Sequence, residues 1–380
     1  MAGKRMKKII FLFFLLLGLA LCGVLFYQTP QEKQFATILS AAKQGNVEAQ
    51  VQAGYAYAEG KGTARDGKQA LFWYRKAALE GDAEALWKTA ETYIQGQLVP
   101  QDLEEAAPFL VLAAKQGSQL AQRELSRFYE EGLGGLPKHA GESLYWQFIA
   151  AKMSGAADSP DLQTARQKDP LLYEQVQRFL DDLKLAQEGD GPARFRTGQA
   201  YLTGNPVLQN AEEAERWLTL AWQENKLPQA GLLLAQNYQS GAVFPADPAR
   251  ANALWNELAQ LAYAPAQYEL GEQAYRADPP RYEDAFAWFS NAAAGGLAAA
   301  QYMTGFMLMQ GQGTEVSVPL AITFFRSAAE QEHVSAQYVL GQIYAKGLGV
   351  AADKTAGRHW LEKAAANGNT AAQELLDTLP

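Results

Sequence analysis

Small and apolar residues return along this chain at a nearly constant step of 36 positions. An alanine marks each period, and its consecutive copies lie 36, 36, 36, 36, 37, 36, 34, 36 and 36 residues apart. A repeat length of about 20–50 residues is typical of proteins that stack one supersecondary unit many times. We call this residue the anchor alanine. Its ten copies are Ala49, Ala85, Ala121, Ala157, Ala193, Ala230, Ala266, Ala300, Ala336 and Ala372.

Each period predicts two antiparallel helices. In the period that begins at Ala49, small and aromatic residues at helical spacing form one apolar face as far as Tyr57. Gly60 then suits the left-handed conformation of a helix C-cap. After a short loop, Asp66 is the expected N-cap of a second helix. The apolar stripe of that second helix contains Ala70, Trp73, Ala77 and Ala78.

Other residue types keep fixed distances from the anchor. Tyrosine comes eight residues after it, at Tyr57, Tyr93, Tyr129, Tyr201, Tyr238 and Tyr344. Glycine comes eleven residues after it, at Gly60, Gly96, Gly132, Gly204, Gly241, Gly311 and Gly347. A large aromatic ring marks one fixed position of the predicted second helix, at Trp73, Phe109, Tyr145, Trp217, Phe324 and Trp360. Because one helix pair cannot bury its apolar face alone, we expect the pairs to stack.

This pattern resembles the Sel-one-like repeat, a short relative of the tetratricopeptide repeat. The clearest copy contains Ala336-Gln337, Leu340-Gly341, Tyr344, Gly347-Leu348-Gly349-Val350, Asp353, Trp360, Ala364-Ala365 and Gly368. The resemblance implies an all-α fold, a right-handed α-solenoid superhelix of about nine stacked helix pairs. It also implies an adaptor that binds other proteins through its concave surface. Relatives act on the exported side of membranes, in protein quality control, exopolysaccharide secretion and host interaction.

The period divides the chain into an N-terminal segment, residues 1–30, and a repeat solenoid, residues 31–380. Residues 156–192 form a degenerate unit that has lost the glycine and tyrosine positions. Residues 266–299 form a unit two residues short, with Pro279-Pro280 in its inter-helix loop. At Trp222 an indole replaces the second alanine of a pair. We expect these three places to alter the curvature or the exposed surface.

Residues 9–27 form an apolar stretch of 19 residues without a charge, directly after four basic residues, Lys4, Arg5, Lys7 and Lys8. The length suits a transmembrane signal anchor, and the basic flank predicts that the repeats face the other side of the membrane. In a bacterium this means the inner membrane with the repeats in the periplasm. Two alternatives remain open: a signal peptide cleaved near Cys22, and a lipoprotein that uses the box from Leu19 to Cys22.

Charge and cysteine content limit the partners. The chain has a net charge of −8, and without the four N-terminal cations it has 29 basic and 41 acidic residues, or −12. This balance excludes a nucleic-acid surface, which needs concentrated positive charge, and favours other proteins as partners. Cys22 is the only cysteine, so the repeats fold without disulfides and lack the cysteine pattern of ligand-hydrolysing relatives.

The sequence predicts a non-enzymatic scaffold with no catalytic residues, no cofactor and no metal. His139, His333 and His359 form no pair at metal-ligand spacing. The glycine-containing loops follow predicted helices rather than strands, which argues against phosphate-binding loops. The resemblance therefore favours assembly or regulation of an envelope complex. The alternatives are an assembly factor of exopolysaccharide secretion and, less favoured, a ligand-hydrolysing member of the repeat family.

Five aromatic residues are the candidate partner contacts. Most rings of this chain occupy the periodic positions and are expected to form the core. Trp87, Trp222 and Tyr263 fall outside those positions, and Phe72 and Tyr74 flank one of them, where we expect partial exposure. Exposed rings of this size often mark binding surfaces.

Overall fold

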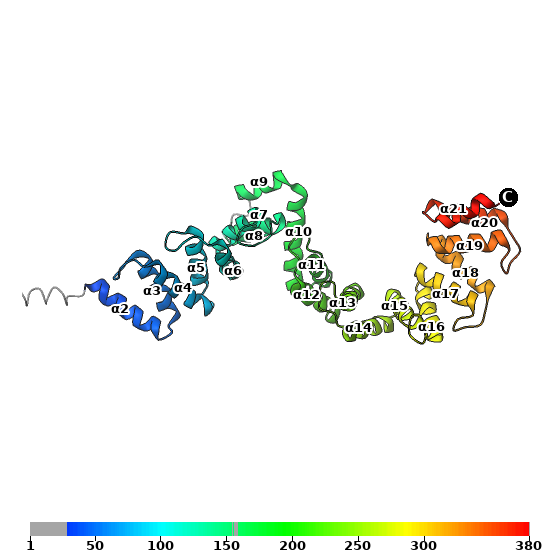
Figure 1. Cartoon of the computed structure of the whole chain (residues 1–380), viewed down its shortest axis with the longest axis horizontal. Helices are drawn as coiled ribbons and strands as arrows, with labels where there is room; N and C mark the ends of the chain where they lie inside the picture. Colours follow the sequence, from blue (N-terminus) through cyan, green and yellow to red (C-terminus); the bar gives the residue numbers. More distant parts are fainter. Residues whose placement is uncertain (1–28, 154, 156–158, 380) are drawn as a thin grey trace, which may run out of the picture. The chain divides into compact units, whose positions relative to one another are not determined.

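The computed structural model describes residues 29–153, 155 and 159–379. Within this part of the chain the secondary structure consists of twenty α-helices and contains no strand (Figure 1). The predicted membrane segment, residues 9–27, lies outside the described residues. The prediction of an all-α solenoid made of repeated helix pairs is confirmed, whereas its right-handedness stays a prediction.

Eight regular periods each contain two helices that pack against each other, and each second helix also packs against the next first helix where the regular periods are consecutive. The first helices are α3 (Val47–Glu59), α5 (Ala83–Gln95), α7 (Gln119–Glu131), α11 (Gly191–Thr203), α13 (Pro228–Ser240), α15 (Ala264–Tyr275), α17 (Ala298–Gln310) and α19 (Val334–Lys346). The second helices are α4 (Gly67–Leu79), α6 (Leu103–Lys115), α8 (Ala140–Met153), α12 (Ala211–Gln223), α14 (Pro248–Gln260), α16 (Tyr282–Ala294), α18 (Val318–Glu330) and α20 (Lys354–Ala366). The other four helices are α2 (Pro30–Lys43), α9 (Pro160–Lys168), α10 (Pro170–Gln187) and α21 (Thr370–Thr378).

The chain divides into two compact units. The first contains residues 1–180 and 205–208, and the second contains residues 181–204 and 209–380. The division falls within α10, a helix of the degenerate unit that is longer than the helices of the regular periods. The two units are therefore described separately below.

The predicted helix ends are confirmed. All seven glycines that come eleven residues after an anchor are C-caps in the left-handed conformation, with φ of 76° at Gly60. Asp66 accepts a hydrogen bond from the backbone N–H of Gln69 (3.0 Å) and so caps α4. Asp353 caps α20 in the same way. The loops thus have the backbone that the repeat pattern requires.

The anchor alanine has a double structural role. In six periods the side chain three residues before the anchor accepts a hydrogen bond from the anchor backbone N–H, and these caps are Asn46, Asp82, Ser118, Asp190, His333 and Asn369. The anchor methyl group is buried in all nine described copies. Ala therefore suits this position because a larger side chain would separate the helices that meet there.

Glycine on the first helix lets a bulky residue of the second helix approach closely. A Cβ atom on Gly54 would lie 2.4 Å from the ring of Tyr74, too close for any side chain. The glycine lies five residues after the anchor, and its partner directly follows the periodic aromatic position of the second helix. The other pairs of this kind are Gly198 with Leu218, Gly271 with Phe289, Gly305 with Phe325, and Gly341 with Leu361.

A buried glutamine connects successive periods. The residue directly after the anchor donates its Nε2–H to the carbonyl of an alanine near the end of the preceding second helix or, for Gln50, of α2. The five bonds run from Gln50 to Ala42, Gln122 to Ala114, Gln267 to Ala259, Gln301 to Ala293, and Gln337 to Ala329, with lengths of 3.1–3.5 Å. Each of these carbonyls also accepts a backbone N–H from the turn after its helix, so the glutamine adds a second hydrogen bond that ties the first helix of one period to the end of the preceding helix.

The degenerate unit covers the outer face of α8. Helix α10 begins at Pro170, and its residue Val176 packs with Leu162 of α9. Both belong to a core cluster that also contains Leu144 and Ala151 of α8. The ring of Tyr173 lies 4.9 Å from that of Phe148, centroid to centroid. Within the first unit, α8 is thus covered on a face that is open to solvent on other second helices.

Candidate interaction surface

The five predicted contact residues differ in their exposure to solvent. Phe72 is exposed over 54% of its surface, as predicted, and Trp87 and Tyr263 are half-buried. Tyr74 and Trp222 are buried, with 1% and 4% exposure. Only Phe72, Trp87 and Tyr263 therefore have a ring surface that a partner can reach, and their role in binding stays a prediction.

The predicted exposure of Tyr74 is wrong. Its ring points into the interface between α3 and α4, against Gly54. The residue of α4 that faces α3 most directly is therefore Tyr74, one position after the periodic aromatic residue Trp73. Burial raises the pKa of the Tyr74 phenol. Tyr74 is therefore a core residue, and two helical steps of about 100° each separate it from the exposed ring of Phe72.

Trp222 is also a packing residue. Its indole lies against Gly231, where an added Cβ would be 3.1 Å from the ring. In most other periods this glycine position holds the glutamine described above, and the Trp222 position holds alanine. The large ring thus fills the space of the missing glutamine side chain. The exchange preserves the interface between α12 and α13, so the break in the period creates no surface site here.

Trp87 belongs to a periodic position that the sequence reasoning missed. It lies two residues after its anchor, and in the second unit the same position holds Phe195, Leu232, Tyr268, Tyr302 and Tyr338. All of these side chains are half-buried. The signal was present in the 36-residue period but was hidden because the residue type varies. Tyr263 instead occupies an N-cap position, at the start of α15, without making a side-chain cap bond.

We call Phe195, Tyr268, Tyr302 and Tyr338 the aromatic row. They lie on the first helices α11, α15, α17 and α19 of the second unit, and Leu232 on α13 has the equivalent position. Each ring packs against the core on one side and reaches solvent on the other. Half-exposed rings at a constant repeat spacing can contact successive side chains of one extended or helical segment.

The phenol groups of the row are fixed by neighbours. The Tyr268 hydroxyl donates to Oε1 of Glu272 (3.2 Å), and the Tyr338 hydroxyl accepts from Nε2 of Gln342 (2.7 Å). Burial is the largest cause that raises the pKa of Tyr268, to about 12. It also raises the pKa of Tyr302. Tyr268 and Tyr302 are therefore neutral at physiological pH and offer apolar ring faces together with hydrogen-bonding edges.

Two histidines serve as helix N-caps. Nδ1 of His139 accepts from the backbone N–H of Glu142 (3.0 Å), and Nδ1 of His333 accepts from that of Ala336 (3.2 Å). The His333 ring stacks on Tyr302 at 4.9 Å, and burial lowers its pKa. His359 lies edge-on to Trp360. Among residues 29–379, as far as they are described, no cluster of His, Cys, Asp and Glu is arranged to hold a metal ion.

Glu142 is the carboxylate whose pKa is most clearly affected by its surroundings. It lies at the start of α8, where burial raises its pKa. Its Oε1 accepts a hydrogen bond from the backbone N–H of Leu208 (2.9 Å), which fixes the segment 205–208 on α8 within the first unit. The nearby His139 is occupied as a cap. This arrangement therefore joins two parts of the first unit and offers no paired acid and base.

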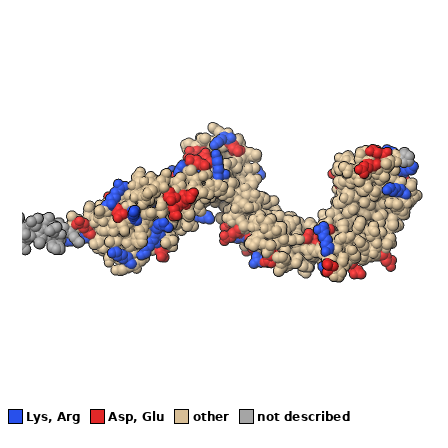
Figure 2. Space-filling view, in the orientation of Figure 1, with Lys and Arg blue, Asp and Glu red and all other residues tan. Residues whose placement is uncertain are grey.

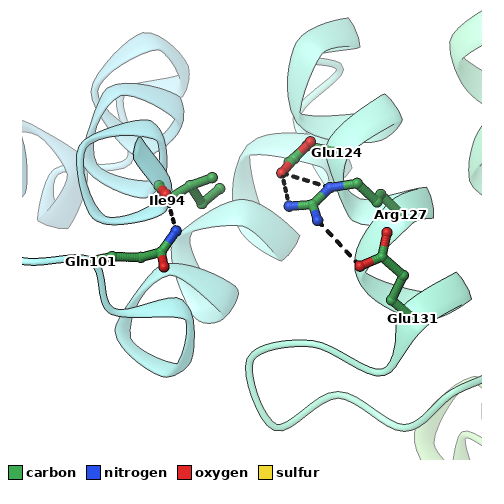
Figure 3. A network of polar contacts seen from close by, with 5 residues as sticks. All are labelled: Ile94, Gln101, Glu124, Arg127 and Glu131. Atoms are coloured by element: carbon green, nitrogen blue, oxygen red, sulfur yellow. Dashed lines mark hydrogen bonds and ion pairs between the residues drawn. The ribbon is translucent and has the colours of Figure 1, made fainter. Parts of the chain in front are cut away.

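Polar side chains in the segment from α5 to α7 form ion pairs on the helix surface and hold an inter-helix loop in place (Figure 3). On α7 the guanidinium of Arg127 lies between the carboxylates of Glu124 and Glu131. Nε2 of Gln101 donates to the carbonyl of Ile94 (2.7 Å), which holds the inter-helix loop against α5. Other periods have the same kind of bond between a loop side chain and the carbonyl of the residue seven positions before it. These bonds run from Arg65 to Ala58 and from Gln209 to Leu202. These groups are therefore structural.

None of the helices from α2 to α21 combines the length and apolar character needed to cross a bilayer.

A family model described as Sel1 repeat matches seven segments of the chain. The segments are residues 47–82, 83–118, 119–154, 191–223, 264–297, 298–333 and 334–369. The unmatched stretches contain the degenerate unit and the period of Ala230. The model does match the shortened unit, so the loss of two residues there leaves the family pattern intact.

Individual relatives are more distant. The chain is 24% identical over 315 residues to the chitin synthase regulator SKT5 of Saccharomyces cerevisiae, covering 81% of this chain and 36% of that protein. It thus spans about a third of the length of this curated relative. A Sel1 repeat protein from Oxalobacter formigenes is 27% identical, with a TM-score of 0.48 over 92% of this chain and 91% of that structure. A protective antigen of uropathogenic Escherichia coli with an SLR fold is 25% identical, with a TM-score of 0.37 over 90% and 81%.

Proposed function

The chain belongs to the Sel1 repeat family, and from this membership we propose that it is a non-enzymatic scaffold that holds other proteins together. Sel1 repeat proteins generally mediate protein–protein interaction and are generally not catalytic. In this chain the periodic side chains are used for packing, capping and connecting the helix pairs. What remains available for function is surface, which suits binding along several repeats rather than chemistry in one pocket.

The observation that carries this proposal is the aromatic row of the second unit. Four rings and one leucine occupy the same position of five consecutive first helices, half-buried and half-exposed. Tyrosine and phenylalanine supply large contact areas at a low cost in conformational entropy. A partner segment that crosses these helices would bury one ring, or the leucine, per repeat. Within the first unit, Trp87 offers a half-buried ring at the equivalent position.

We further propose that the scaffold is held in the inner membrane of a bacterium and that its repeats lie in the periplasm. Support comes from the uncharged stretch of residues 9–27 and the basic residues before it. There the scaffold would help to assemble or regulate an envelope complex. Cleavage near Cys22 would instead give a periplasmic protein with the same binding surface.

A second candidate function is assembly or regulation of a polysaccharide-producing apparatus. The relative named as a chitin synthase regulator favours it, because chitin is a polysaccharide and that protein matches 81% of this chain. On this proposal one partner is an enzyme that makes or exports a polysaccharide. The two functions share one surface and differ only in the identity of the partner.

Affinity capture with the full chain tests the scaffold proposal. We expect a defined set of proteins to be recovered, and Tyr302→Ser/Tyr338→Ser to reduce recovery about tenfold or more, since two half-exposed rings are lost. Thr323→Ser is the control, because Thr323 is exposed on a second helix of the same unit. Equal recovery by the double variant, at unchanged helix content, would contradict the proposal. Recovery of polysaccharide synthesis proteins would favour the second candidate.

A further inference from the structure

Helix α4 carries an apolar and basic face that none of the described residues covers. Phe72 is exposed over 54% and Leu79 over 81% of its surface. Both line a surface hollow together with Leu71 and the stems of Lys68, Arg75 and Lys76. We call these six residues the α4 face. A second hollow, between α2 and α4, shares Phe72 and Lys76 and adds Lys43.

The repeat itself shows that this face is exceptional. Phe72 lies directly before the periodic aromatic position of its second helix. In other second helices the equivalent residues are Pro108, Arg216, Ala253, Ala287, Thr323 and His359, none of which is large and apolar. A bulky apolar side chain recurs there in α8, where it is Leu144. Leu144 is buried, whereas Phe72 is not.

The cover of α8 indicates what fits on such a face. Leu144 packs with Leu162 of α9 and Val176 of α10, two helices of the degenerate unit. Ala151, which corresponds to Leu79, is buried in the same cluster. The chain therefore covers an apolar second-helix face with amphipathic helices. On α4 the equivalent residues are open to solvent, so a helix from another protein can take the same place.

Charge distinguishes the two faces. On α8 the positions of Arg75 and Lys76 hold the uncharged Gln147 and Phe148. On α4, Arg75 donates to the hydroxyl of Tyr93 and lies 3.7 Å from Glu105. Lys68 and Lys76 form no ion pair with any described residue, although Nζ of Lys76 lies 5.4 Å from the centroid of Trp73. In Figure 2, Lys and Arg side chains lie over the N-terminal helices of the described chain, interspersed with Asp and Glu.

We propose that the α4 face docks an acidic amphipathic helix of a partner protein. The apolar stripe of that helix packs on Phe72 and Leu79, and its carboxylates face Lys68, Lys76 and Lys43. This inference rests on the proposed scaffold function and assigns it a partner chemistry. Residues at i, i+3, i+4 and i+7 share one face of a helix, and on α4 Phe72, Arg75, Lys76 and Leu79 have this spacing, which suits packing against the matching stripe of a partner helix.

Selection of displayed random peptides on the full chain in nanodiscs tests the docking. We expect the enriched peptides to be acidic, with apolar residues at helical spacing. They should bind Lys68→Glu/Lys76→Glu about tenfold or more weakly, and their affinity should fall as salt rises. Phe72→Ser should also weaken binding. Lys363→Glu is the matched control, because Lys363 holds the Lys76 position on α20 and lies over Trp360 in the same way.

Enrichment of peptides without an acidic bias, or equal binding by the charge-reversed variant, would overturn the inference. A second outcome would also overturn the inference: no peptide is enriched, and phosphatidylglycerol vesicles protect a label attached at position 79 from solvent. That result would show that the α4 face binds a lipid surface. In either case, capture that still depends on Tyr302 and Tyr338 would leave the scaffold function standing. If no acidic peptide is selected and the capture of partner proteins does not depend on Tyr302 and Tyr338, the scaffold function is rejected as well.

Discussion

At the scale of single residues, the side chains that most resemble functional groups have structural tasks. His139 and His333 cap helices through Nδ1. Glu142 accepts a backbone hydrogen bond that fixes a neighbouring segment. Gln122 and its counterparts donate a second hydrogen bond to carbonyls at the end of the preceding helix. A solenoid built from short helices has many helix ends, and each end needs partners for its free backbone groups. Polar side chains of the repeat meet this need.

The cap formed by His333 makes stability depend on pH. Nδ1 accepts the hydrogen bond only when it is unprotonated, and burial lowers the pKa of His333 in the folded chain. The unfolded chain, with a histidine pKa of about 6.5, binds the proton first, so stability is lost as the pH falls below that value. We expect His333→Asn to remove this part of the acid sensitivity, because Asn46 caps α3 without titrating in this range.

Thermal melting of both proteins between neutral and mildly acidic pH measures the effect. The melting temperature of the wild type should fall more steeply than that of His333→Asn. Other histidines and carboxylates contribute equally to the two curves, so their difference reports on His333 alone. Parallel curves would show that the imidazole cap is not the titrating contact.

Sequence alone predicts the residue roles that depend on local backbone. Gly60 and Asp66 are recognisable as caps because cap preferences involve only neighbouring residues. Tyr74 and Phe72 are harder to distinguish. They are two positions apart on one helix, and either can belong to the core when the inward direction of the helix is uncertain by one residue. The direction is fixed by Gly54 on another helix, and a contact between helices cannot be read from one segment.

At the scale of helices, the pairing of glycine with a bulky side chain sets how closely the two helices of a period approach. Glycine weakens a helix, so its presence in the middle of α3 has a cost in helix propensity. The close contact with the buried Tyr74 ring offsets that cost. In the next period, Ala90 and Leu110 occupy the same two positions and are fully buried. In this one period the larger first-helix residue thus faces a partner smaller than Tyr74.

This pairing predicts a rescue. Gly54→Ala places a methyl group within the Tyr74 ring and should destabilise the chain by about 1–3 kcal/mol, the usual cost of overpacking. Gly54→Ala/Tyr74→Leu copies the natural pair Ala90 and Leu110 and should recover most of the loss. Chemical denaturation monitored by helix content measures both. A double variant less stable than Gly54→Ala would show that the ring itself, rather than its fit to Gly54, stabilises the pair.

At the scale of the whole molecule, the period predicts the repeats well and the functional surface poorly. The anchor alanines, caps and helix pairs follow from residues that are nearly invariant among the repeats. The aromatic row was missed because its position in the repeat holds Phe, Tyr or Leu in different periods of the second unit, which are all large and largely apolar but differ in identity. The break at Trp222 was visible in the sequence, but its compensation by Gly231 depends on contact between periods. A residue that breaks the repeat pattern can therefore serve the packing between helices rather than the binding of a partner.

The side of the membrane on which the repeats lie is also a prediction for the whole chain. Fusion of alkaline phosphatase after Tyr27 in a bacterial host should give an active enzyme, because the basic residues before position 9 favour retention of the N-terminus in the cytoplasm. A reporter active only in the cytoplasm serves as the reciprocal control. Activity of that second reporter at the same position would place the repeats in the cytoplasm and contradict the periplasmic proposal.

Site-specific photo-crosslinking in intact cells tests the central claim, that partners bind along the first helices. A photoreactive amino acid would replace Phe195, Tyr268, Tyr302 or Tyr338 in turn. The controls are four positions on second helices of the same unit, Arg216, Ala253, Thr323 and His359, which are all exposed. We predict that the aromatic-row positions form adducts with one shared protein and that the controls do not. Adducts at the controls alone, or none at any position in cells that contain the partners, would contradict the account.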